Sequence, residues 1–501
     1  MEPKESCWVA TRPPTAEAKP LTSFGLRVDV AVIGGGLVGL TAALLLARAG
    51  RAVAVIESRR AGRQVTGGST AKVTSQHGAV YRQLVEGFGE SGARIYAESN
   101  QAALDWIARE VAERQLECDF ERRAAYVWTE DPARVADLER EAETAFRLGL
   151  PASFERQAPL PWPVAGAVRF DAQAQFHPVR WTEALAADLV ARGGALYEET
   201  RVIDVEEGKP CRVVTERGLL HADDVIVATN LPILDRGGFF GKAFPQRHMA
   251  LAGPIDEAKA PEGMFIGLDQ PTRSIRTAPL DGGGRMLVLV GEAFPTGHGD
   301  AAASERRLEE FARTRLGLTD IRWRWGNQDY YAADRVPYVG RILPGERRIR
   351  VATGFNAWGI TTGTVAAMIL ADDILGRRNP WAPLYDSLRI KPGVGGRAML
   401  GKNLHVARTW LEDRISRPAT QAADLAAGQG GVVRHGGETV AAWRDPQGAL
   451  HLVSHVCTHM GCHLRWNAAE LSWDCPCHGS RFDVDGRVVQ GPAVRDLERK
   501  A

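Results

Sequence analysis

The chain lacks any apolar run long enough to cross a bilayer, for which a helix needs about 20 mostly apolar residues. We therefore expect no integral membrane segment, although 45% of the 501 residues are hydrophobic. The N-terminus also lacks the basic and then apolar pattern of a secretory signal, and it carries no twin arginine. These absences predict a cytoplasmic protein.

An excess of charge of either sign is missing as well. The 62 Lys and Arg residues balance 61 Asp and Glu residues, which gives a formal net charge of +1. No global field attracts nucleic acid or an anionic membrane, so we expect neither as a partner. Cysteine is scarce, with seven residues, and Cys7, Cys118 and Cys211 are scattered. That usage excludes the disulfide framework of a small secreted domain.

The other four cysteines lie in two short loops near the C-terminus, together with two histidines. These residues are Cys457, His459, Cys462, Cys475, Cys477 and His478. Thiolates and imidazoles together suit a [2Fe–2S] cluster with two sulfur ligands on one iron and two nitrogen ligands on the other. A structural zinc site is the alternative, because zinc also binds Cys and His. Common zinc fingers place two cysteines before two histidines, whereas the order Cys-His, Cys-His favours the iron–sulfur cluster.

The two loops closely resemble those of a Rieske domain. By that resemblance the cluster ligands are Cys457, His459, Cys475 and His478. The resemblance also implies a disulfide between Cys462 and Cys477. It makes the chain an electron carrier.

Three further features of the C-terminal region bear on the cluster. Ser480 stands where the family has a serine that donates to a bridging sulfide. Phe482 stands where the members of highest potential have a tyrosine bonded to a ligand sulfur, so we expect an intermediate reduction potential. The segment Gly491-Pro492-Ala493 resembles the proline loop that covers the cluster, and an ordinary terminal turn is the alternative.

A dinucleotide-binding pattern lies near the N-terminus. A β-branched stretch over 28–33 predicts a strand, and an apolar helix is expected over 40–49, after a glycine-rich turn. In that turn Gly34 permits the sharp bend, Gly36 lets the backbone approach a pyrophosphate, and Gly39 lets the helix pack on the strand. The pyrophosphate would lie at the positive N-terminus of the helix.

An acidic residue completes this pattern. A second strand, over 52–56, ends in Glu57, about 20 residues beyond the glycines, where a carboxylate binds ribose hydroxyls. A glycine-rich turn without a ligand is the alternative. The complete order of strand, turn, helix and strand favours nucleotide binding.

Three later segments resemble the D-amino-acid-oxidase-like flavoproteins, which include glycine and sarcosine oxidases. They are 67–72, 224–230 and the block from 325 to 363. With the dinucleotide pattern, the resemblance covers roughly residues 25–380 and implies FAD as a cofactor. It also implies that the last glycine-rich turn and helix N-terminus face the flavin ring, where a helix N-terminus stabilises negative charge. The further FAD-contacting positions that the resemblance implies are Thr70, Ala71, Ala228, Thr229, Gly354, Trp358, Gly359 and Thr361.

These patterns divide the chain into an N-terminal arm, an FAD-dependent oxidoreductase, a linker and a Rieske domain. Their expected bounds are 1–24, 25–390, 391–425 and 426–501, with FAD-binding parts at about 25–90, 170–240 and 325–385. The segments between those parts are expected to form an antiparallel sheet with helices. The predicted fold class is an α/β Rossmann-like FAD-binding module with an α+β substrate domain, plus a C-terminal all-β Rieske domain. Within the linker we expect a loop over 391–396 and a helix over 404–415.

Two residues are candidates for chemistry beside the flavin. Lys72 would stabilise negative charge on the reduced ring, and an exposed surface lysine is the alternative. His77 either lies near the ring or is a satisfied core histidine. Three further residues, Arg276, Tyr330 and Trp358, either line a substrate cavity or serve in packing.

The pairing of such a flavoprotein with a C-terminal Rieske domain is itself a recognisable family, usually assigned to amine oxidation. We therefore expect FAD-dependent oxidation of a small secondary or N-methylated amine or amino acid. Electrons would pass from FAD through the cluster to an external acceptor. Such enzymes need no strong acid–base catalyst, because positioning supplies most of the help.

Two other classes of function stay open. An NAD(P)H-driven reductase that feeds a partner enzyme usually carries a second dinucleotide fingerprint, and the sequence has none. A redox-sensing protein without catalysis is the other possibility. The absence of a two-His-one-carboxylate pattern argues against a Rieske oxygenase.

Overall fold

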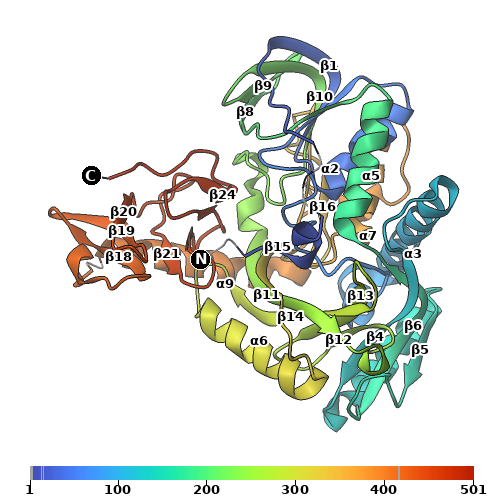
Figure 1. Ribbon diagram of the computed structural model, residues 1–501. Coiled ribbons are helices and arrows are strands. Elements are labelled where there is room, and N and C mark those ends of the chain that lie inside the picture. Colours follow the sequence, from blue (N-terminus) through green and yellow to red (C-terminus); the bar gives the residue numbers. More distant parts are fainter. Residues whose placement is uncertain (1–3, 13, 15, 416–417, 501) are drawn as a thin grey trace.

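The computed structural model describes residues 4–12, 14, 16–415 and 418–500. Its elements form a large part, in blue through yellow to light orange in Figure 1, and a smaller C-terminal part in darker orange and red on one side of it. The large part contains two sheets with helices, and the small part is built on two small antiparallel sheets. This architecture confirms the predicted fold class.

An eight-stranded sheet forms one layer of the large part. Its strands are β1 Phe24–Ile33, β2 Val53–Ile56, β7 Ala195–Tyr197, β8 Val202–Glu206, β9 Cys211–Thr215, β10 Leu219–Val227, β16 Tyr338–Arg341 and β17 Ile349–Thr353. The order along the sheet is β16-β17-β10-β1-β2-β7, with β9 beside β10 and β8 beside β9. β1 is parallel to both β2 and β10, and β10 is parallel to β17. The carboxyl ends of these strands therefore meet at one edge, where open α/β sheets bind ligands.

Three helices cover this sheet. α2 (Leu37–Arg48) follows β1 after the glycine turn, α7 (Thr361–Ile374) follows β17, and both begin at the edge where the strands end. α2 packs against α7 and against α5 (Pro178–Ala191). Both α2 and α7 are apolar over most of their surface, as a helix between a sheet and other helices must be.

A nine-stranded sheet forms the second layer of the large part. Its strands are β3 Lys72–Val73, β4 Glu121–Thr129, β5 Ala152–Glu155, β6 Gly166–Gln175, β11 Ala243–Ile255, β12 Met264–Gly267, β13 Arg273–Pro279, β14 Arg285–Pro295 and β15 Trp323–Ala332. The order is β15-β11-β14-β13-β12-β4-β6-β3, with β5 beside β6. The pairs are antiparallel except β12 with β4.

Further helices flank the two sheets. α6 (Ala301–Leu316) packs on β11 and β14, and α4 (Val135–Arg147) packs on β5 and β6. α3 (Tyr81–Arg114) is kinked at Gly89, where the backbone leaves the helical region. α8 (Ala382–Tyr385) is a single turn beside β16. Strands β4, β5 and β11 to β14 lie in the segments predicted as a substrate domain, whereas β3 and most of β15 lie in predicted FAD-binding parts.

The N-terminal segment packs into the large part through α1 (Cys7–Ala10). The Trp8 side chain is fully buried, and its Nε1 donates to the Ser69 carbonyl at 2.8 Å. The Ser6 hydroxyl donates to the Gly67 carbonyl at 2.5 Å. The segment thereby supports the turn that precedes β3.

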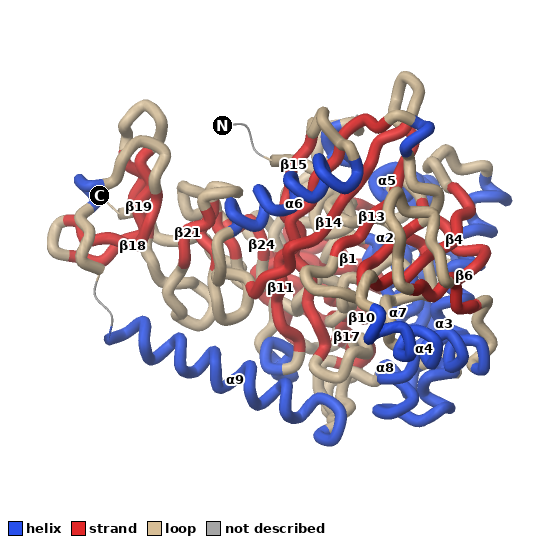
Figure 2. Tube along the Cα trace, turned by 90° about the horizontal axis from the view of Figure 1, so that it is seen from below, coloured by secondary structure: helices blue, strands red, loops and turns tan. Residues whose placement is uncertain are grey.

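A long helix, α9 (Pro392–Ile415), joins the two parts and runs along one side of their junction in Figure 2. The predicted helix over 404–415 is confirmed, but the loop predicted over 391–396 is wrong. The glycines of that stretch suggested a loop, whereas Pro392 is compatible with a first helical turn. A Cβ on Gly395 would lie 2.9 Å from the Ala333 carbonyl carbon, so glycine lets the start of α9 approach the large part. Among the described residues, no helix combines the length and apolarity that a membrane span requires.

The small part consists of a three-stranded and a four-stranded sheet. The first contains β18 Gly430–His435, β19 Glu438–Arg444 and β20 Leu450–Val453, and the second contains β21 Arg465–Asn467, β22 Ser472–Asp474, β23 Arg481–Phe482 and β24 Val488–Gln490. The loop between β20 and β21 carries Cys457, and the loop between β22 and β23 carries Cys475. Both cysteines belong to the core of this part, with Trp473 and Phe482.

Candidate functional site

A cavity of about 1080 Å³ lies in the large part and is lined by both of its sheets. At one side it meets the carboxyl-end edge of the eight-stranded sheet. Of the predicted site residues, those that line it are Gly34, Gly36, Glu57, Thr70, His77, Ala228, Thr229, Trp358 and Gly359. The cavity therefore gathers most of the positions that the sequence assigned to FAD, from segments more than 300 residues apart.

The glycine turn before α2 forms bare backbone at the helix N-terminus. Gly34 has a φ of +106°, and a Cβ there would lie 2.5 Å from the Ala228 carbonyl oxygen. A Cβ on Gly39 would lie 1.9 Å from the Gly34 carbonyl oxygen, so this glycine serves the packing of α2 and does not line the cavity. Gly36 caps α2 and lines the cavity. Exposed amides at a helix N-terminus are the arrangement that holds a pyrophosphate.

Glu57 braces this turn while it faces the cavity. Its Oε2 accepts a hydrogen bond from the Gly35 amide at 2.7 Å, and its Oε1 accepts one from the Arg59 amide at 2.9 Å. Burial raises the pKa of the Glu57 carboxyl above its ordinary value. Its contact with a ribose stays a prediction.

The turn before α7 also lines the cavity. Trp358 and Gly359 belong to it, and the α7 N-terminus carries the positive end of the helix dipole there. Thr361 is buried behind this turn, and its hydroxyl donates to the Thr74 carbonyl at 2.9 Å. Gly354 has a φ of +78°, and a Cβ there would lie 3.1 Å from the Ala332 Cβ. It does not line the cavity.

His77 is both a cavity residue and a satisfied core histidine. Its Nδ1 is 2.7 Å from the Tyr96 hydroxyl, and its Nε2 lies 2.8 Å from the Thr74 carbonyl oxygen and 3.0 Å from the Thr361 hydroxyl. The ring stacks on Trp358 with centroids 5.0 Å apart. Burial lowers the pKa of His77 to about 3, so the imidazole is neutral at physiological pH.

Lys72 is buried, so the alternative of an exposed surface lysine is wrong. Its Nζ donates to the Phe265 carbonyl at 2.6 Å and to the Ser274 hydroxyl at 2.7 Å. Burial, and then the charge of Arg276, hold its pKa well below the ordinary lysine value. Lys72 is not among the cavity-lining residues, although Ser274 is. Its role beside the flavin stays a prediction.

The buried Arg276 lies under the turn that contains Thr70 and Ala71. Its Nη1 donates to both of their carbonyls, at 2.8 and 3.0 Å, and its guanidinium lies over the Trp8 ring. Ala71 itself is buried and does not line the cavity. Of the three residues that the sequence left between cavity and packing, Trp358 alone lines the cavity, since Arg276 holds the turn and Tyr330 points elsewhere.

The second site lies between the two cysteine-containing loops of the small part. A disulfide joins Cys462 and Cys477, with sulfurs 2.12 Å apart. The thiols of Cys457 and Cys475 are buried side by side, and the Cys475 hydrogen bond lowers the pKa of Cys457 to about 7. The three close sulfurs of Cys462, Cys475 and Cys477 do not form a metal site by themselves, because two of them are tied in the disulfide.

The two histidines complete a set of four donors. The Nδ1 atoms of His459 and His478 are buried and accept or donate no hydrogen bond within the described part of the chain. Their rings are 5.1 Å apart and nearly perpendicular. Buried polar atoms without a partner require a ligand, and two imidazole nitrogens beside two thiols fit a [2Fe–2S] cluster of mixed ligation.

Backbone hydrogen bonds hold the two loops in shape. The Cys457 amide donates to the Cys462 carbonyl, and the Cys475 amide donates to the Ser480 carbonyl, both at 2.8 Å. The Ala493 amide donates to the Ser480 hydroxyl at 3.0 Å. The segment that resembles a proline loop thus lies directly against the second loop.

Strands β11 and β15 border the cavity on one face and the cluster loops of the small part on the other. Successive side chains of a strand point to opposite faces. On the cavity face lie Gln246, His248, Asn327, Asp329 and Tyr331. Their neighbours along the two strands contact the small part. One pair of strands is therefore the wall of both sites.

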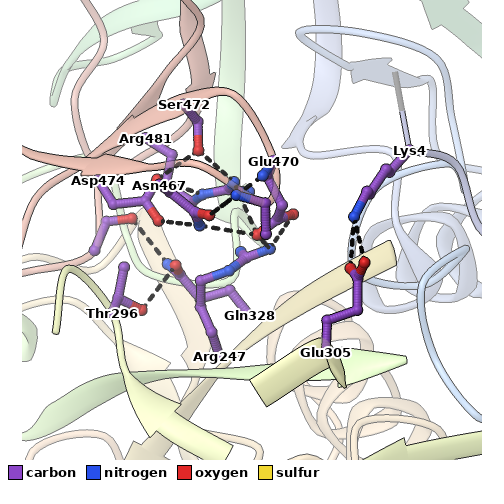
Figure 3. Close-up of polar contacts among 12 residues, drawn as sticks. Lys4, Arg247, Thr296, Glu305, Gln328, Asn467, Glu470, Ser472, Asp474 and Arg481 are labelled. Atoms are coloured by element: carbon purple, nitrogen blue, oxygen red, sulfur yellow. Dashed lines mark hydrogen bonds and ion pairs between the residues drawn. The ribbon is translucent and has the colours of Figure 1, made fainter. Parts of the chain in front are cut away.

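On the face toward the small part, the side chains of these strands form hydrogen bonds and an ion pair with that part. The Tyr330 hydroxyl donates to the His478 carbonyl at 2.9 Å. The side-chain amide of Gln328 (Nε2) donates to the Gly479 carbonyl at 2.8 Å. The Arg247 guanidinium forms a buried ion pair with Glu470, which also contacts Arg481 at 3.2 Å. Figure 3 shows this polar cluster.

A second contact reaches the histidine side of the cluster loops. The His459 Nε2 donates to Asp235 Oδ1 at 2.5 Å, and the Phe240 ring lies 5.1 Å from the His478 ring. The His459 side chain is only 4% exposed as a result. The small part is thus docked with its histidines against the large part.

Sequence reasoning missed the docking residues, including Asp235, Arg247 and Gln328. Each acts across more than 150 residues of chain. No local motif announces such a pair. The available signal at Arg247 was the polar run Gln246-Arg247-His248 inside a strand that is otherwise apolar.

Comparison with known proteins agrees with both sites. The family model FAD dependent oxidoreductase (DAO) matches residues 29–373, and the Rieske [2Fe-2S] domain model matches residues 417–499. A putative Rieske 2Fe-2S iron-sulfur protein of Bacillus subtilis (strain 168), YhfW, is 35% identical over 96% of this chain and 94% of its own.

Two further proteins resemble the large part. Gamma-glutamylputrescine oxidoreductase of Escherichia coli (strain K12) is 24% identical over 75% of this chain and 89% of its own. The crystal structure of glycine oxidase from Geobacillus kaustophilus has a TM-score of 0.61 at 20% identity, and it covers 73% of this chain and 100% of that chain. This last likeness shows the fold. The chain belongs to the FAD dependent oxidoreductase family and carries a Rieske [2Fe-2S] domain, with FAD and the cluster as its cofactors.

Proposed function

We propose that the chain oxidises a small secondary or N-methylated amine or amino acid with FAD, and passes the electrons through the Rieske cluster to an external acceptor. Two comparisons support the amine: one relative is named for gamma-glutamylputrescine, and a structural neighbour is named for glycine. A cytoplasmic location stays a prediction from the sequence.

The observation that carries the proposal is the common wall between the two sites. Asp329 on β15 lines the cavity, and the next residue, Tyr330, donates to the carbonyl of His478. The two cofactor sites therefore lie on opposite faces of one strand. Electron transfer between cofactors depends on close approach, and this arrangement supplies it without a movement of the small part.

FAD bound in the cavity would supply an acceptor for hydride from the carbon beside the amine, once the nitrogen has lost its proton, and a donor of single electrons. The chain supplies the place and the exclusion of water. The turn that contains Trp358 and the α7 N-terminus border the cavity, and residues 488–491 of the small part line it too. The docked small part thus forms part of the boundary of the cavity, and it is proposed to accept electrons from the flavin bound there.

Cys457, Cys475, His459 and His478 would hold the cluster, which supplies a one-electron carrier. The histidines face the large part, where Asp235 accepts the hydrogen bond from His459. A carboxylate on a ligand imidazole fixes the ring and its tautomer. The chain thus orients the nitrogen side of the cluster site toward the source of electrons.

The test is anaerobic mixing of the loaded protein with a panel of N-methylated amines and amino acids. Flavin absorbance and the EPR signal of the reduced cluster are followed in the same samples. The proposal expects at least one amine to bleach the flavin and to produce the cluster signal. Reduction by NADH, with none by any amine, would instead make the chain a reductase that feeds a partner enzyme.

A further inference from the structure

Only two of the described residues that line the cavity carry a carboxylate, Glu57 and Asp329. The Glu57 carboxylate already accepts two backbone amides beside the glycine turn. Asp329 lies on the other sheet, on β15, and its side chain is 16% exposed. It is therefore the carboxylate that remains available to a molecule in the cavity.

The surroundings of Asp329 leave its charge unpaired on the cavity face. No hydrogen bond reaches its carboxylate from the described residues, and the nearest basic nitrogen, His248 Nε2, is 4.0 Å away. That nitrogen lies 3.2 Å from the Tyr331 hydroxyl. Burial lowers the pKa of His248 to about 4, so this imidazole is neutral. Gln246, directly opposite on β11, carries no charge.

Among the described residues, the cation whose charge acts on Asp329 is Arg247, and it belongs to the other face of the wall. Its guanidinium is engaged with Glu470 of the small part. A carboxylate in a largely buried site costs free energy unless a partner compensates it. Asp329 therefore has no compensating partner among the described residues. Arg247, on the face toward the small part, is already paired with Glu470.

Aromatic rings stand beside this carboxylate. Tyr331 lines the cavity two residues along β15, and Phe244 lines it from the paired position on β11. Ring faces attract cations, ammonium groups among them. A carboxylate together with aromatic rings is a receptor for a cationic nitrogen.

We propose that Asp329 binds the cationic nitrogen of the substrate, so that the substrate presents an ammonium group, and not a carboxylate, to this wall. The inference rests on the proposed function and names the group by which its amine is recognised. It also orders the amine panel: amines without a carboxylate near the nitrogen bind better than α-amino acids. Binding of a cation here places the amine on the strand whose opposite face holds the cluster loops.

The experiment uses the full chain loaded with FAD and cluster, and tetramethylammonium as the probe. This cation is small, permanently charged and without an N–H bond. Its binding is measured by calorimetry and by the perturbation of flavin absorbance. We expect Asp329→Asn, which keeps the shape of the side chain, to weaken binding about tenfold or more, as the loss of a charged partner does.

Two further variants control the result. Asp320→Asn removes an equal charge at the surface, where the side chain is 54% exposed, and it should bind the probe as the unaltered chain does. Asp329→Glu keeps the charge and should retain more affinity than Asp329→Asn. The FAD content of each variant shows that the cavity has formed.

The outcomes separate this inference from the proposed function. Equal affinity of Asp329→Asn and the unaltered chain, or no binding of the probe at all, overturns the role of Asp329 even where amines reduce the flavin. Binding that depends on Asp329, without reduction by any amine, leaves the cation site standing and overturns amine oxidation.

Discussion

Strands β11 and β15 carry polar side chains on both faces, but the two faces differ in how those groups are paired. On the face toward the small part, Arg247, Gln328 and Tyr330 each have a partner across the junction. On the cavity face, Asp329 has none within the described chain. Paired polar groups hold two parts together, whereas an unpaired one indicates a ligand. The contrast separates the docking face from the binding face on the same strands.

The largest loss of stability is expected from a substitution of Arg247 on the docking face. Arg247→Met leaves Glu470 buried with one of its two arginine partners, and we expect the free energy of unfolding to fall by about 3 kcal/mol. Urea unfolding of the loaded chain, followed by tryptophan fluorescence, measures the change. Lys4→Met is the matched control, because it removes one side of the part-exposed Lys4–Glu305 pair in Figure 3.

The control should cost about 1 kcal/mol or less. The double variant Arg247→Met/Glu470→Gln removes both charges of the pair, and it should recover much of the loss. A double variant as unstable as Arg247→Met alone would show that the buried pair does not account for the effect.

Binding of a cation at the cavity face should depend on pH. Burial raises the pKa of Asp329 to about 7, against the favourable charge of Arg247. The carboxylate is ionised above that pH, so affinity for tetramethylammonium should rise as pH increases and fall about tenfold per unit below pH 7. The groups that face Asp329 on its two strands, His248 and Tyr331, stay neutral from pH 5 to 9, because burial lowers the pKa of the first and raises that of the second. Affinity for the probe independent of pH over that range would contradict the assignment.

A smaller effect is expected at Tyr330, the residue between the two faces. Tyr330→Phe removes the hydrogen bond to the His478 carbonyl and leaves the ring in place. We expect a loss of about 1 kcal/mol in the free energy of unfolding and an unchanged affinity for tetramethylammonium. A change in probe affinity equal to that of Asp329→Asn would show that the two faces are not independent.

The smallest effect on stability is expected at Asp235, whose side chain is 56% exposed. Its negative charge on the His459 imidazole stabilises the oxidised cluster, so Asp235→Asn should raise the reduction potential by on the order of tens of millivolts. An EPR-monitored redox titration measures the shift. An unchanged or lower potential would contradict the role of this contact.

Local motifs account for what the sequence predicted well. The glycine turn with Gly34 and Gly36 lines the cavity, because strand, turn and helix are formed by adjacent residues. The four cluster donors lie in two short loops and come together there. The Cys457 and Cys475 thiols are hydrogen-bonded to each other, and the Nδ1 atoms of both histidines have no hydrogen bond within the described chain. Spacing along the chain determines such geometry almost alone.

The rest depends on contacts between distant segments. Composition does not reveal burial, so Lys72 remained open between the surface and the flavin site until its Nζ was seen against Phe265 of β12 and Ser274 of β13. The start of α9 was mistaken for a loop because glycine is a poor helix former in isolation, whereas here it permits close packing on Ala333. The pairing of Arg247 with Glu470 joins residues 223 positions apart and has no local signal.

The proposed relay requires that electrons cross the wall of β15 within one molecule. It is tested by single-turnover reduction under anaerobic conditions, with the rates of flavin oxidation and cluster reduction measured at two protein concentrations tenfold apart. We expect the cluster to be reduced as the flavin is reoxidised, at a rate that does not change with protein concentration. A rate that rises in proportion to concentration, or a cluster that stays oxidised beside a reduced flavin, would contradict it.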